Sequence, residues 1–576
     1  MTLRNPPFAS LALSFFLATA FHTAQAAVND ELHALVTSAQ QAPASGARPY
    51  DERDWLERFY APRAYAPAWL VNGTAKASAA IAVLRSAPAN GLTASDYQVD
   101  ELEKQLRTAT PNDAKLDAAI TRAMLHYLAE LKVGRLRSEY LAAGPDPRLK
   151  TFDPVEQLRT ALAENRLAAL AASAESQMPQ YQHVKAALAH YRELAQFPQT
   201  ALPLPAKGAK IESGAAYPQA GTLRVLLERL GDDPGAPGAG PDDHYTPALV
   251  EAVKRFQARH GLESDGVLGR DTVGALNTPL QQRVRQLELT LERLRWVPDL
   301  PAGPVIIVNL PAFHLWAYDT AAKNAQPLEM KVIVGAATKT ETPLFIGTMR
   351  YLEFNPYWNV PRSIEKAEII PKMEKNASYL AENDMEMVPT GGGAAIQGGD
   401  AAALEGLRAG SYRVRQRPGP KNALGTVKFA MPNPDNIYLH WTSAAELFKR
   451  TRRDLSHGCI RVEKPAALAE FVLASNADWD AEKIATAMEP GTSKTVSLKT
   501  TIPVVLFYTT ATTDAKGKAI FSPDVYLRDA ALGALLDKHN GGSARPVPKP
   551  VAVAAPKPKS APKPAPTEPL PNAPLN

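Results

Sequence analysis

The first part of the chain has the hydrophobic period of α-helices. Between Asp113 and Leu136, apolar residues recur three or four positions apart, at Leu116, Ile120, Met124, Leu125, Leu128 and Leu131. This spacing places one apolar stripe along a helix. Val184 to Leu194 shows the same pattern, and we therefore predict a mostly helical domain over residues 27–215.

A shorter helical module is predicted over residues 218–280. Thr246 can cap a helix that has Pro247 at its first position, where proline is favoured. The following turns carry one apolar face, formed by Leu249, Val253 and Phe256. Pro- and Gly-rich stretches at 201–218 and 231–243 are typical of linkers or loops, which makes the module a compact unit between loops.

Beyond residue 303 the pattern changes to short apolar or alternating runs, which are typical of β-strands. The predicted strands are 305–310, 315–318, 331–335, 342–345, 496–508 and 519–526. Helices are predicted over 466–473 and 530–536. We therefore expect an α+β multidomain protein with a mainly-β domain over 303–510 and a strand and helix extension over 511–540.

An insertion of about residues 361–429 interrupts this β-domain. Ile364 to Leu380 is predicted to be helical, and the three glycines after Thr390 predict a flexible loop. A mobile helical insertion ahead of the later strands could act as a lid that excludes water. A surface elaboration without that role fits the pattern equally well.

Both ends of the chain differ from the parts between them. Residues 1–26 have a basic residue near their start, Arg4, followed by an apolar run from Ala9 to Phe21. They end in Ala-Gln-Ala, as secretory signal peptides do. No later run approaches the roughly 20 apolar residues that span a bilayer. Residues 541–576 are rich in Pro, Ala and Lys, which predicts a disordered or extended tail.

The composition is that of globular domains, with 45% hydrophobic and 21% charged residues in a chain of 576. A chain of this length is too long for one hydrophobic core, so several domains are expected. The net charge of +5 is small. It suits an anionic partner such as a cell-wall polymer and is too weak and dispersed to indicate nucleic-acid binding.

The chain has a single cysteine, Cys459, which cannot form an intrachain disulfide. Residues 437–440 and 459–462 both alternate in polarity, as half-buried strands do. If the two strands pair, Cys459 and Arg461 lie on the same face as Tyr438 and His440. The alternation therefore predicts a thiol, an imidazole, a guanidinium and a phenol in one place.

Two neighbouring segments complete the predicted site. Ser443 to Arg450, between the two strands, is predicted to be a short helix with Ser443 as its N-cap. Tyr357 and Trp358, just before the insertion, are candidates to line a groove, although aromatic residues at strand spacing are more often part of a core.

This combination of residues fits nucleophilic catalysis. A neighbouring histidine can take the proton of a thiol, whose pKa is ordinarily about 8.5. Gly458 lets a substrate approach the backbone closely, and the N–H groups at this turn can hold an oxyanion. Arg461 can bind a carboxylate through two hydrogen bonds. The alternatives are a cysteine that only packs in a core and histidines that are only structural.

The histidines do not have the spacing of metal ligands, and no carboxylate cluster accompanies them. We therefore predict that the site uses neither a metal ion nor a cofactor.

The sequence Ser-His-Gly-Cys-Ile-Arg-Val at 456–462, preceded by Ile-Tyr-Leu-His at 437–440, resembles the signature of L,D-transpeptidase catalytic domains. Those enzymes cross-link peptidoglycan through a cysteine acyl-enzyme. The resemblance implies that Cys459 is the nucleophile and His440 its general base. It also implies that His457 and Gly458 shape the nucleophile loop and that Arg461 contacts the substrate.

Three aromatic residues are predicted as further substrate contacts: Tyr438, Trp441 and Trp358. The family usually has a small or acidic residue after its first histidine, where this chain has Trp441. If only the backbone carbonyl of that residue orients the imidazole, a tryptophan is tolerated, and the groove is expected to differ in shape.

Two other regions resemble parts of the same enzymes. Residues 252–262 followed by 265–269 closely resemble a peptidoglycan-binding domain, and this resemblance is independent of the cysteine motif. Residues 65–69 and 91–97, within the helical region, resemble the scaffold region of the large multidomain L,D-transpeptidases of Gram-negative bacteria.

The resemblance implies a periplasmic enzyme that forms 3→3 cross-links between stem peptides and releases D-alanine. Its expected partners are peptidoglycan stem peptides and glycan strands, together with cell-wall synthases. Three alternatives stay open: an L,D-carboxypeptidase that uses water at the same site, a non-catalytic wall-binding scaffold, and a cysteine protease of another kind. An intact Cys459 and His440 count against the scaffold.

Overall fold

The computed structural model of the chain describes residues 26–39, 51–71, 73–136, 138, 140, 146–233, 243–322, 326–337, 339–397 and 401–539. They form two compact units, one from the described residues of 1–198, 254–265 and 280–545, the other from those of 199–253 and 266–279. The predicted signal peptide, apart from Ala26, and the predicted tail at 541–576 lie outside the described residues. None of the described helices is both long enough and apolar enough to cross a bilayer.

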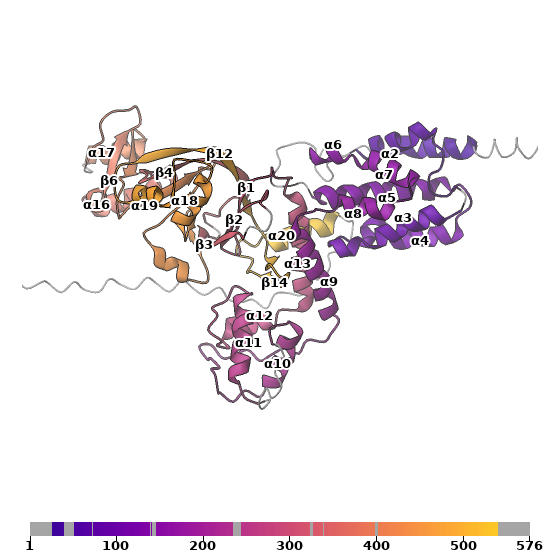
Figure 1. Cartoon of the computed structure of the whole chain (residues 1–576), viewed down its shortest axis with the longest axis horizontal. Coiled ribbons are helices and arrows are strands. Elements are labelled where there is room, and N and C mark those ends of the chain that lie inside the picture. Colours follow the sequence, from indigo (N-terminus) through magenta and orange to yellow (C-terminus); the bar gives the residue numbers. More distant parts are fainter. Residues whose placement is uncertain are drawn as a thin grey trace, which may run out of the picture. The chain divides into compact units, whose positions relative to one another are not determined.

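The N-terminal region is a set of helices packed side by side, as the hydrophobic period predicted (Figure 1). Residues 26–38 form the first helix. The others are α2 (Glu52–Tyr60), α3 (Ala75–Arg85), α4 (Val99–Thr108), α5 (Ala114–Val133), α6 (Arg148–Phe152), α7 (Pro154–Ala163), α8 (Leu167–Ala174) and α9 (Pro179–Leu194). One hydrophobic core runs through the region, so the prediction of a helical domain is confirmed.

The ends of these helices follow from local chemistry. The side chain of Asp113 accepts a hydrogen bond from the backbone N–H of Leu116 at 3.0 Å, which caps α5 where the pattern predicted its start. Helix α9 begins at Pro179, five residues before the predicted Val184. Proline at a first helical position has the required φ and gives up no hydrogen bond, which explains the earlier start.

The second unit is small and helical, as predicted. It contains α10 (Ala220–Arg229), α12 (Arg270–Leu276) and the first part of α11 (Pro247–Ala258). Thr246 caps α11, because its Oγ1 accepts a hydrogen bond from the N–H of Leu249 at 3.4 Å. Isolated β-bridges join Ile211 to Leu268 and Ala216 to His244, and these fasten the loops of the unit.

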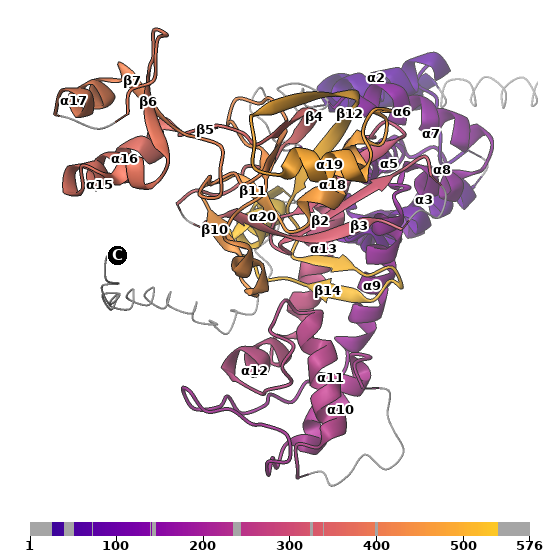
Figure 2. The same cartoon turned by 60° about the vertical axis from the view of Figure 1, so that its left-hand side comes forward.

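The β-rich part of the chain is built on one mixed β-sheet (Figure 2). Its strands are β1 (Pro304–Asn309), β2 (His314–Asp319), β3 (Leu328–Gly335), β4 (Ile346–Phe354), β8 (Val427–Ala430), β9 (Leu439–His440), β10 (Asp454–Ser456), β11 (Ile460–Val462) and β12 (Lys494–Phe507). Helices α18 (Pro465–Leu473) and α19 (Ala481–Met488) follow β11. The predicted mainly-β domain is confirmed.

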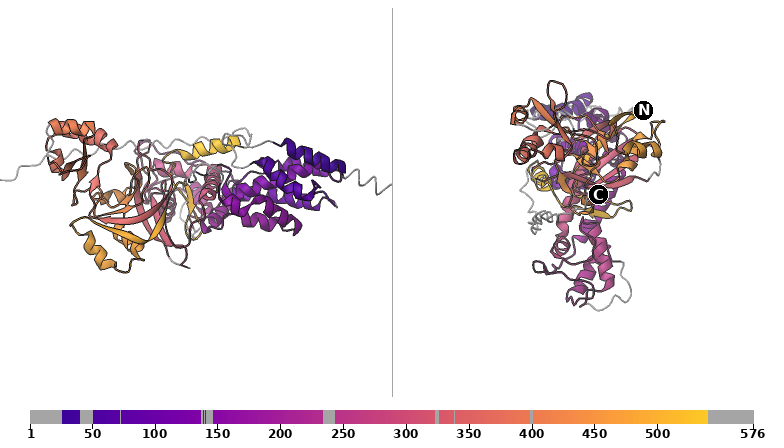
Figure 3. Two further views of the ribbon diagram at one scale, coloured as in Figure 1. Left: turned by 90° about the horizontal axis from the view of Figure 1, so that it is seen from above. Right: turned by 90° about the vertical axis from the view of Figure 1, so that its left-hand side faces the viewer.

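The sheet closes on itself. Its strand order is β10-β3-β11-β9-β8-β4-β12-β1-β2, and β2 also pairs with β3, so the ring from β3 to β2 has no open edge. Figure 3 shows the curvature of the strands. Their buried apolar side chains form one hydrophobic core together with residues of α18. Closure removes unpaired strand edges and holds the short strands β9 and β11 on both sides.

Two predicted strands differ from the structure. Residues 342–345 form no strand, because the side chain of Thr342 is committed to a loop: its Oγ1 accepts from the N–H of Gly335 at 2.9 Å and donates to the carbonyl of Gly458 at 2.7 Å. Strand β14 (Ala519–Phe521) ends five residues early. Pro523 cannot continue a ladder, and Asp524 accepts from the N–H groups that begin the next helix.

The insertion is a mixed α/β lobe, and the prediction that it is simply helical was wrong (Figure 2). Its elements are β5 (Trp358–Asn359), α14 (Arg362–Ile364), a π-helical turn η4 (Glu365–Ile369), α15 (Ile370–Lys375), α16 (Tyr379–Glu382), β6 (Met385–Pro389), α17 (Ala401–Ala409) and β7 (Tyr412–Gln416). The strands form a three-stranded sheet in the order β5-β7-β6, and the lobe has its own hydrophobic core. The predicted helix 364–380 breaks at Asn376, whose backbone is extended.

Helix α13 (Leu280–Trp296) carries a buried ionic network. Glu292 is fully buried and accepts hydrogen bonds from the backbone N–H and Nε of Arg135, at 2.6 and 3.1 Å, and from the guanidinium of Arg295, at 2.8 Å. Burial alone would raise the pKa of Glu292, but the two arginines outweigh it and hold the pKa at about 2.

The last described elements of the chain are the hairpin formed by β13 (Ala511–Thr513) and β14, and helix α20 (Arg528–His539).

Candidate active site

The two strands that carry the predicted catalytic residues are direct neighbours. Strand β11 pairs with β9 in parallel, with Ile460 beside Leu439 and Arg461 beside His440. The N–H of Ile460 donates to the carbonyl of Tyr438 at 3.0 Å, so the predicted nucleophile Cys459, just before β11, lies next to Tyr438. The predicted pairing of the two strands is therefore present, and it brings the four predicted side chains together.

Burial alternates along β11 as the sequence indicated. Ile460 and Val462 are fully buried in the core, whereas Cys459 and Arg461 are partly exposed. On β9, Leu439 is fully buried and His440 is only 4% exposed. The exposed face of β11 therefore presents a thiol and a guanidinium to any substrate, with the imidazole behind them.

The loop before the nucleophile is fastened by hydroxyl groups that the sequence did not single out. Ser456 Oγ donates to the carbonyl of Cys459 at 2.6 Å and accepts from the N–H of Gly458 at 3.2 Å. Thr340 Oγ1 donates to the carbonyl of Ser456 at 3.0 Å, and Thr342 holds the carbonyl of Gly458. These bonds fix the loop before any substrate arrives, which is the preorganisation that a nucleophile requires.

Gly458 has a backbone conformation that favours glycine, with φ of +114°. A Cβ atom there would also lie 3.3 Å from Cδ1 of Ile437. Because its N–H is bonded to Ser456, this group is not free to hold an oxyanion, contrary to the simplest form of the prediction. The N–H of Cys459 itself is the other candidate at this turn.

The thiol of Cys459 is protonated in this environment. Its Sγ lies 3.6 Å from the carbonyl oxygen of Asn436, to which it donates. Burial raises the pKa of Cys459, although hydrogen bonds from Tyr438 and the positive charges of Lys428 and Arg461 oppose this shift. The free site therefore holds a thiol that can be converted to a thiolate by a base.

His440 is held as a neutral imidazole. Its Nδ1 donates to the carbonyl oxygen of Trp441 at 2.5 Å, which places the lone pair on Nε2. Burial lowers the pKa of His440 to about 3, and the charge of Arg461 adds to the shift, while the carbonyls of Trp441 and Leu424 oppose it. The tautomer is the one that a general base needs.

Within the described residues, no hydrogen bond joins His440 to Cys459. The thiol donates to the backbone carbonyl of Asn436, and the proton of the imidazole is on Nδ1, which donates to the carbonyl of Trp441. Catalytic hydrogen bonds are often long in free enzymes and form in the substrate complex. Proton transfer from Cys459 to His440 therefore requires that a hydrogen bond between the two side chains forms first.

Arg461 has an unused hydrogen-bond donor next to the nucleophile. Its Nε is buried and has no hydrogen-bond partner among the described residues. Burial lowers the pKa of Arg461, and the nearby Cys459 and Glu446 oppose the shift. A buried charged donor without a partner costs free energy, and a substrate carboxylate would remove that cost.

Two of the predicted aromatic residues lie at the site. The ring of Tyr438 lies 5.8 Å from that of His440, edge to face, and the ammonium of Lys428 lies 5.0 Å from the centre of the Tyr438 ring. Burial raises the pKa of Tyr438; a hydrogen bond between its side chain and Cys459 adds to the shift, and one with Trp358 opposes it. Trp358, from β5 of the insertion, therefore reaches the site through Tyr438.

The third aromatic residue, Trp441, packs rather than lining an open groove. Its ring stacks on Phe448, with centroids 6.2 Å apart and planes 10° apart. It also covers Gly425, where a Cβ atom would lie only 2.5 Å from the Trp441 ring. The hydrogen bond from His440 goes to the backbone carbonyl of Trp441, which does not depend on the side chain, so a tryptophan is accommodated at this position.

His457 connects the nucleophile loop to the insertion. Its Nε2 lies 2.6 Å from Oε1 of Glu368, in the π-helical turn η4. Burial raises the pKa of Glu368, but His457 and Lys372 outweigh it and the net pKa is lowered. Both partners are partly exposed, so this ion pair contributes little to stability.

The segment between the two strands differs from its prediction. A 3-10 helix, η5, spans Ala445–Lys449, and Ser443 does not cap it; the residue at the N-cap position is Ala444. No side chain caps this helix; Oγ1 of Thr442 accepts a hydrogen bond from the N–H of Ala444 at 3.2 Å, in the turn that precedes it. A tighter turn suits the short span between β9 and β10.

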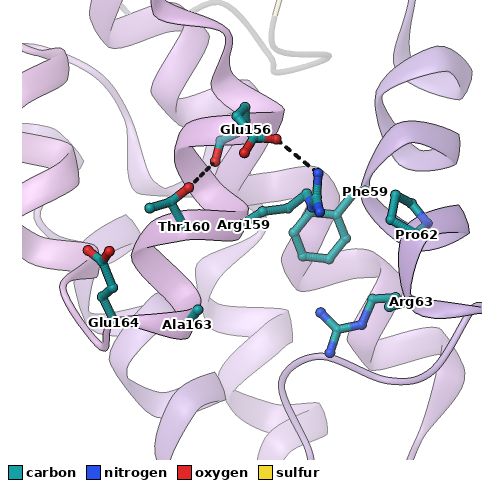
Figure 4. A pocket seen from close by; sticks show the side chains of 8 residues that line it. All are labelled: Phe59, Pro62, Arg63, Glu156, Arg159, Thr160, Ala163 and Glu164. Carbon is teal, nitrogen blue, oxygen red and sulfur yellow. Dashed lines mark hydrogen bonds and ion pairs between the residues drawn. The ribbon is translucent and has the colours of Figure 1, made fainter.

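Elsewhere in the described residues, no group of three or more His, Cys, Asp or Glu side chains could hold a metal ion. A pocket of about 390 Å³ lies in the helical region (Figure 4). Arg159 is paired there with Glu156, and neither a cysteine nor a histidine lines this pocket. The residues around Cys459 therefore form the candidate active site.

Sequence comparisons agree with this geometry. Residues 303–505 match the model of the L,D-transpeptidase catalytic domain, residues 54–188 match that of a Scaffold domain, and residues 217–276 match that of a "Putative peptidoglycan binding domain". Residues 303–505 are therefore similar to L,D-transpeptidase catalytic domains, and earlier parts of the chain are similar to a scaffold domain and to a putative peptidoglycan binding domain. All three resemblances found in the sequence are confirmed.

Two curated proteins are similar to parts of the chain. A "Putative L,D-transpeptidase" of Haemophilus influenzae is 31% identical over 303 residues, which are 51% of this chain and 59% of that protein. The N-acetylmuramoyl-L-alanine amidase CwlL of Bacillus licheniformis is 39% identical over 89 residues, 14% of this chain and 24% of that protein. The chain therefore spans less than two thirds of the curated relatives that it matches.

A solved structure of an L,D-transpeptidase from Stackebrandtia nassauensis covers 53% of this chain and 97% of its own length, at 14% identity and a TM-score of 0.21. This TM-score is too low to support an argument about the fold.

Proposed function

We propose that this protein is a peptidoglycan L,D-transpeptidase that forms 3→3 cross-links through a thioester on Cys459. One observation carries the proposal: the pairing of β9 with β11 places Cys459, His440 and Arg461 at one site, and the buried Nε of Arg461 lacks a partner there. A thiol, a neutral imidazole and an unsatisfied guanidinium together fit acyl transfer from a substrate that carries a carboxylate.

In the first step, Nε2 of His440 takes the thiol proton and Sγ of Cys459 attacks the carbonyl that precedes a terminal D-alanine. The N–H of Cys459 is placed to donate to the developing oxyanion. The C–N bond breaks, the leaving amine receives the proton from His440, and D-alanine departs. An acyl group remains on Cys459 as a thioester.

In the second step, a side-chain amine of another stem peptide attacks the thioester carbon. His440 takes a proton from this amine and returns it to the departing sulfur, so the neutral pair of the free site is restored. Throughout, Arg461 binds a substrate carboxylate near the reacting carbonyl. The steps need no oxidant, reductant or added group.

An L,D-carboxypeptidase is the second candidate, because water can replace the amine at the same thioester. One observation favours transfer over hydrolysis. The insertion contacts the nucleophile loop through Glu368 and His457, and Trp358 reaches Tyr438 beside the thiol. A lobe in contact with the loop from two directions can restrict the access of water to the thioester.

The proposal extends to partners and location. The peptidoglycan binding domain supports peptidoglycan as the partner, with glycan strands and stem peptides as the bound chemistry and cell-wall synthases as further partners. The features of residues 1–26 support export to the periplasm. Fractionation of cells that produce the full chain, followed by mass analysis of its N-terminus, tests both the location and the cleavage after Ala26.

The decisive experiment incubates the purified protein with disaccharide-tetrapeptide fragments and reads product masses, with Cys459→Ala in parallel. A dimer formed with loss of one D-alanine, absent from the variant, supports transpeptidation. Tripeptide monomers alone would move the assignment to carboxypeptidase. A dimer formed equally well by Cys459→Ala would contradict the thioester mechanism.

A further inference from the structure

The turn formed by residues 422–425 lies between the insertion and β8, and it is tied to both ends of the insertion. Asn422 is 1% exposed. Its Nδ2 donates to the carbonyl of Pro356, just before the insertion, and to that of Arg417, just after β7, both at 2.9 Å. Its Oδ1 accepts from the N–H of Leu424 at 2.8 Å. One buried side chain therefore fastens the entry, the exit and the turn together.

The same turn supports the side chain that follows the general base. Gly425 has φ of +64°, and a Cβ atom there would lie 2.5, 2.9 and 3.0 Å from three atoms of Trp441. Trp441 cannot easily move away, because its ring is stacked on Phe448 and its backbone N–H donates to the carbonyl of Val427 at 3.0 Å. The absence of a side chain at 425 is thus what lets Trp441 occupy its place.

The position of Trp441 determines the orientation of His440. The carbonyl of Trp441 accepts the hydrogen bond from Nδ1 of His440 at 2.5 Å, and the carbonyl of Leu424, in the turn itself, also interacts with the ring. The turn therefore positions two carbonyl groups beside the imidazole. It contains that of Leu424, and it leaves room at Gly425 for the side chain of Trp441, whose carbonyl is the other.

We propose that Asn422 and Gly425 are positioning residues that set the orientation of His440 and connect it to the insertion. The inference rests on the proposed role of His440 as general base. Neither residue touches the reacting atoms: Gly425 leaves room for Trp441, and Asn422 fixes the turn to Pro356 and Arg417, in the two segments that connect the insertion to the sheet. A displacement of the insertion is thereby transmitted to the base.

The test compares Gly425→Ala with Gly392→Ala. Both glycines have positive φ, +64° and +87°, so both substitutions carry the cost of a left-handed conformation, but a Cβ at 392 meets nothing within 4 Å. We expect Gly425→Ala to lower kcat about 10- to 100-fold with KM within about twofold, since small misplacement of a catalytic group costs that much. Gly392→Ala should retain the wild-type kcat.

A second readout does not depend on turnover. The rate of alkylation of Cys459 by iodoacetamide is measured against pH in the full chain, because it reports the thiol and its surroundings. Gly425→Ala should shift this profile and Gly392→Ala should not. The double variant Gly425→Ala with Trp441→Ala removes the ring atoms that clash and should recover part of the kcat. If Gly425→Ala does not fold, Asn422→Ala tests the same inference, because it frees the turn and should also lower kcat.

The outcomes separate this inference from the proposed function. A wild-type kcat and an unshifted profile in both Gly425→Ala and Asn422→Ala, with folded protein, overturn the positioning role while the transpeptidase proposal stands. A loss that Trp441→Ala fails to relieve also overturns the route through Trp441. An inactive wild type whose alkylation profile still shifts in Gly425→Ala supports the positioning role and contradicts the proposed function.

Discussion

The ionic network on α13 and the site around Cys459 both bury ionisable side chains, and they treat them in opposite ways. In the network, Glu292 receives hydrogen bonds from Arg135 and Arg295, and its pKa falls to about 2, which favours the charged form. In the site, the ring of His440 faces backbone carbonyls, and its pKa falls to about 3, which favours the neutral form. The network stabilises the charged form of its carboxylate, and the site stabilises the neutral form of its imidazole.

The difference lies in the partners, since burial is common to both regions. A buried charge is tolerated when opposite charges and donors surround it, and it is neutralised when they do not. The thiol is kept in its neutral form in the same way, and the Nε of Arg461 has no partner. We infer that the network stabilises the fold, while the site gives up stability to keep groups available for a substrate.

The comparison is tested most strongly by removing the nucleophile. Cys459→Ala should reduce cross-linking to background, because no other thiol exists in the chain. The free energy of unfolding should change by less than about 1 kcal/mol, since the partly exposed sulfur is replaced by a methyl group. Product mass spectrometry and urea titration measure the two quantities. A large loss of stability would show that the thiol is structural.

The converse change removes a charge from the network. Glu292→Gln leaves Arg135 and Arg295 buried without their counter-charge and should destabilise the protein by about 3–5 kcal/mol. The activity of the molecules that remain folded should be unchanged. Glu193→Gln, on the exposed face of α9, is the matched control and should lie within about 0.5 kcal/mol of wild type. If Glu292→Gln and Glu193→Gln unfold at the same temperature, the network does not stabilise the fold.

Acid should act on the network in a defined pH window. The pKa of Glu292 is lower in the folded chain, about 2, than its ordinary value of 4.5, so the unfolded chain binds the proton first. Its contribution is complete above about pH 4.5 and disappears as the pH falls toward 2, at a cost of about 3 kcal/mol. Unfolding curves of wild type and Glu292→Gln, measured across this window, should converge. Parallel curves would contradict the assignment.

Removing the unused donor should affect binding rather than folding. Arg461→Met should lower kcat/KM about 10- to 100-fold, the worth of one or two hydrogen bonds to a charged group. Its free energy of unfolding should change little, because the Nε has no partner to lose. Arg452→Met removes an exposed arginine paired with Asp454 and serves as the control. The prediction is wrong if both variants bind the tetrapeptide fragment like wild type.

The smallest effect is expected at the contact between the insertion and the nucleophile loop. Glu368→Gln removes an exposed ion pair with His457, worth less than about 1 kcal/mol after screening by solvent. Hydrogen exchange of residues 456–459 should become faster, with kcat changed less than about threefold. Glu374→Gln removes a pair with Arg408 within the same lobe and should leave that exchange rate unaltered.

Local pattern determined much of this protein. The helical period predicted α5 and α9, and the threonine and proline at 246–247 predicted the start of α11. Alternating polarity placed Cys459 and Arg461 on one face and Ile460 and Val462 on the other, since side chains alternate across a strand whatever its neighbours are. The pairing of β9 and β11 then followed from the match of their polar faces.

Other features could not be obtained from pattern. The insertion has a sheet of its own because β5 and β7, more than 50 residues apart, pair with each other, and a short strand has almost no signal by itself. The same holds for Thr340, Thr342 and Ser456, whose hydroxyl groups converge on the nucleophile loop only after the sheet closes.

By itself, the sequence predicted which residues would carry the proposed chemistry, because a single thiol, two histidines and an arginine at short spacing are set by the chain order. Tertiary structure alone decided their state. Burial beside Arg461 makes His440 neutral, the carbonyl of Trp441 selects its tautomer, and Glu292 stays charged among arginines from distant segments. Protonation depends on the distances to charges and to water, and folding sets those distances.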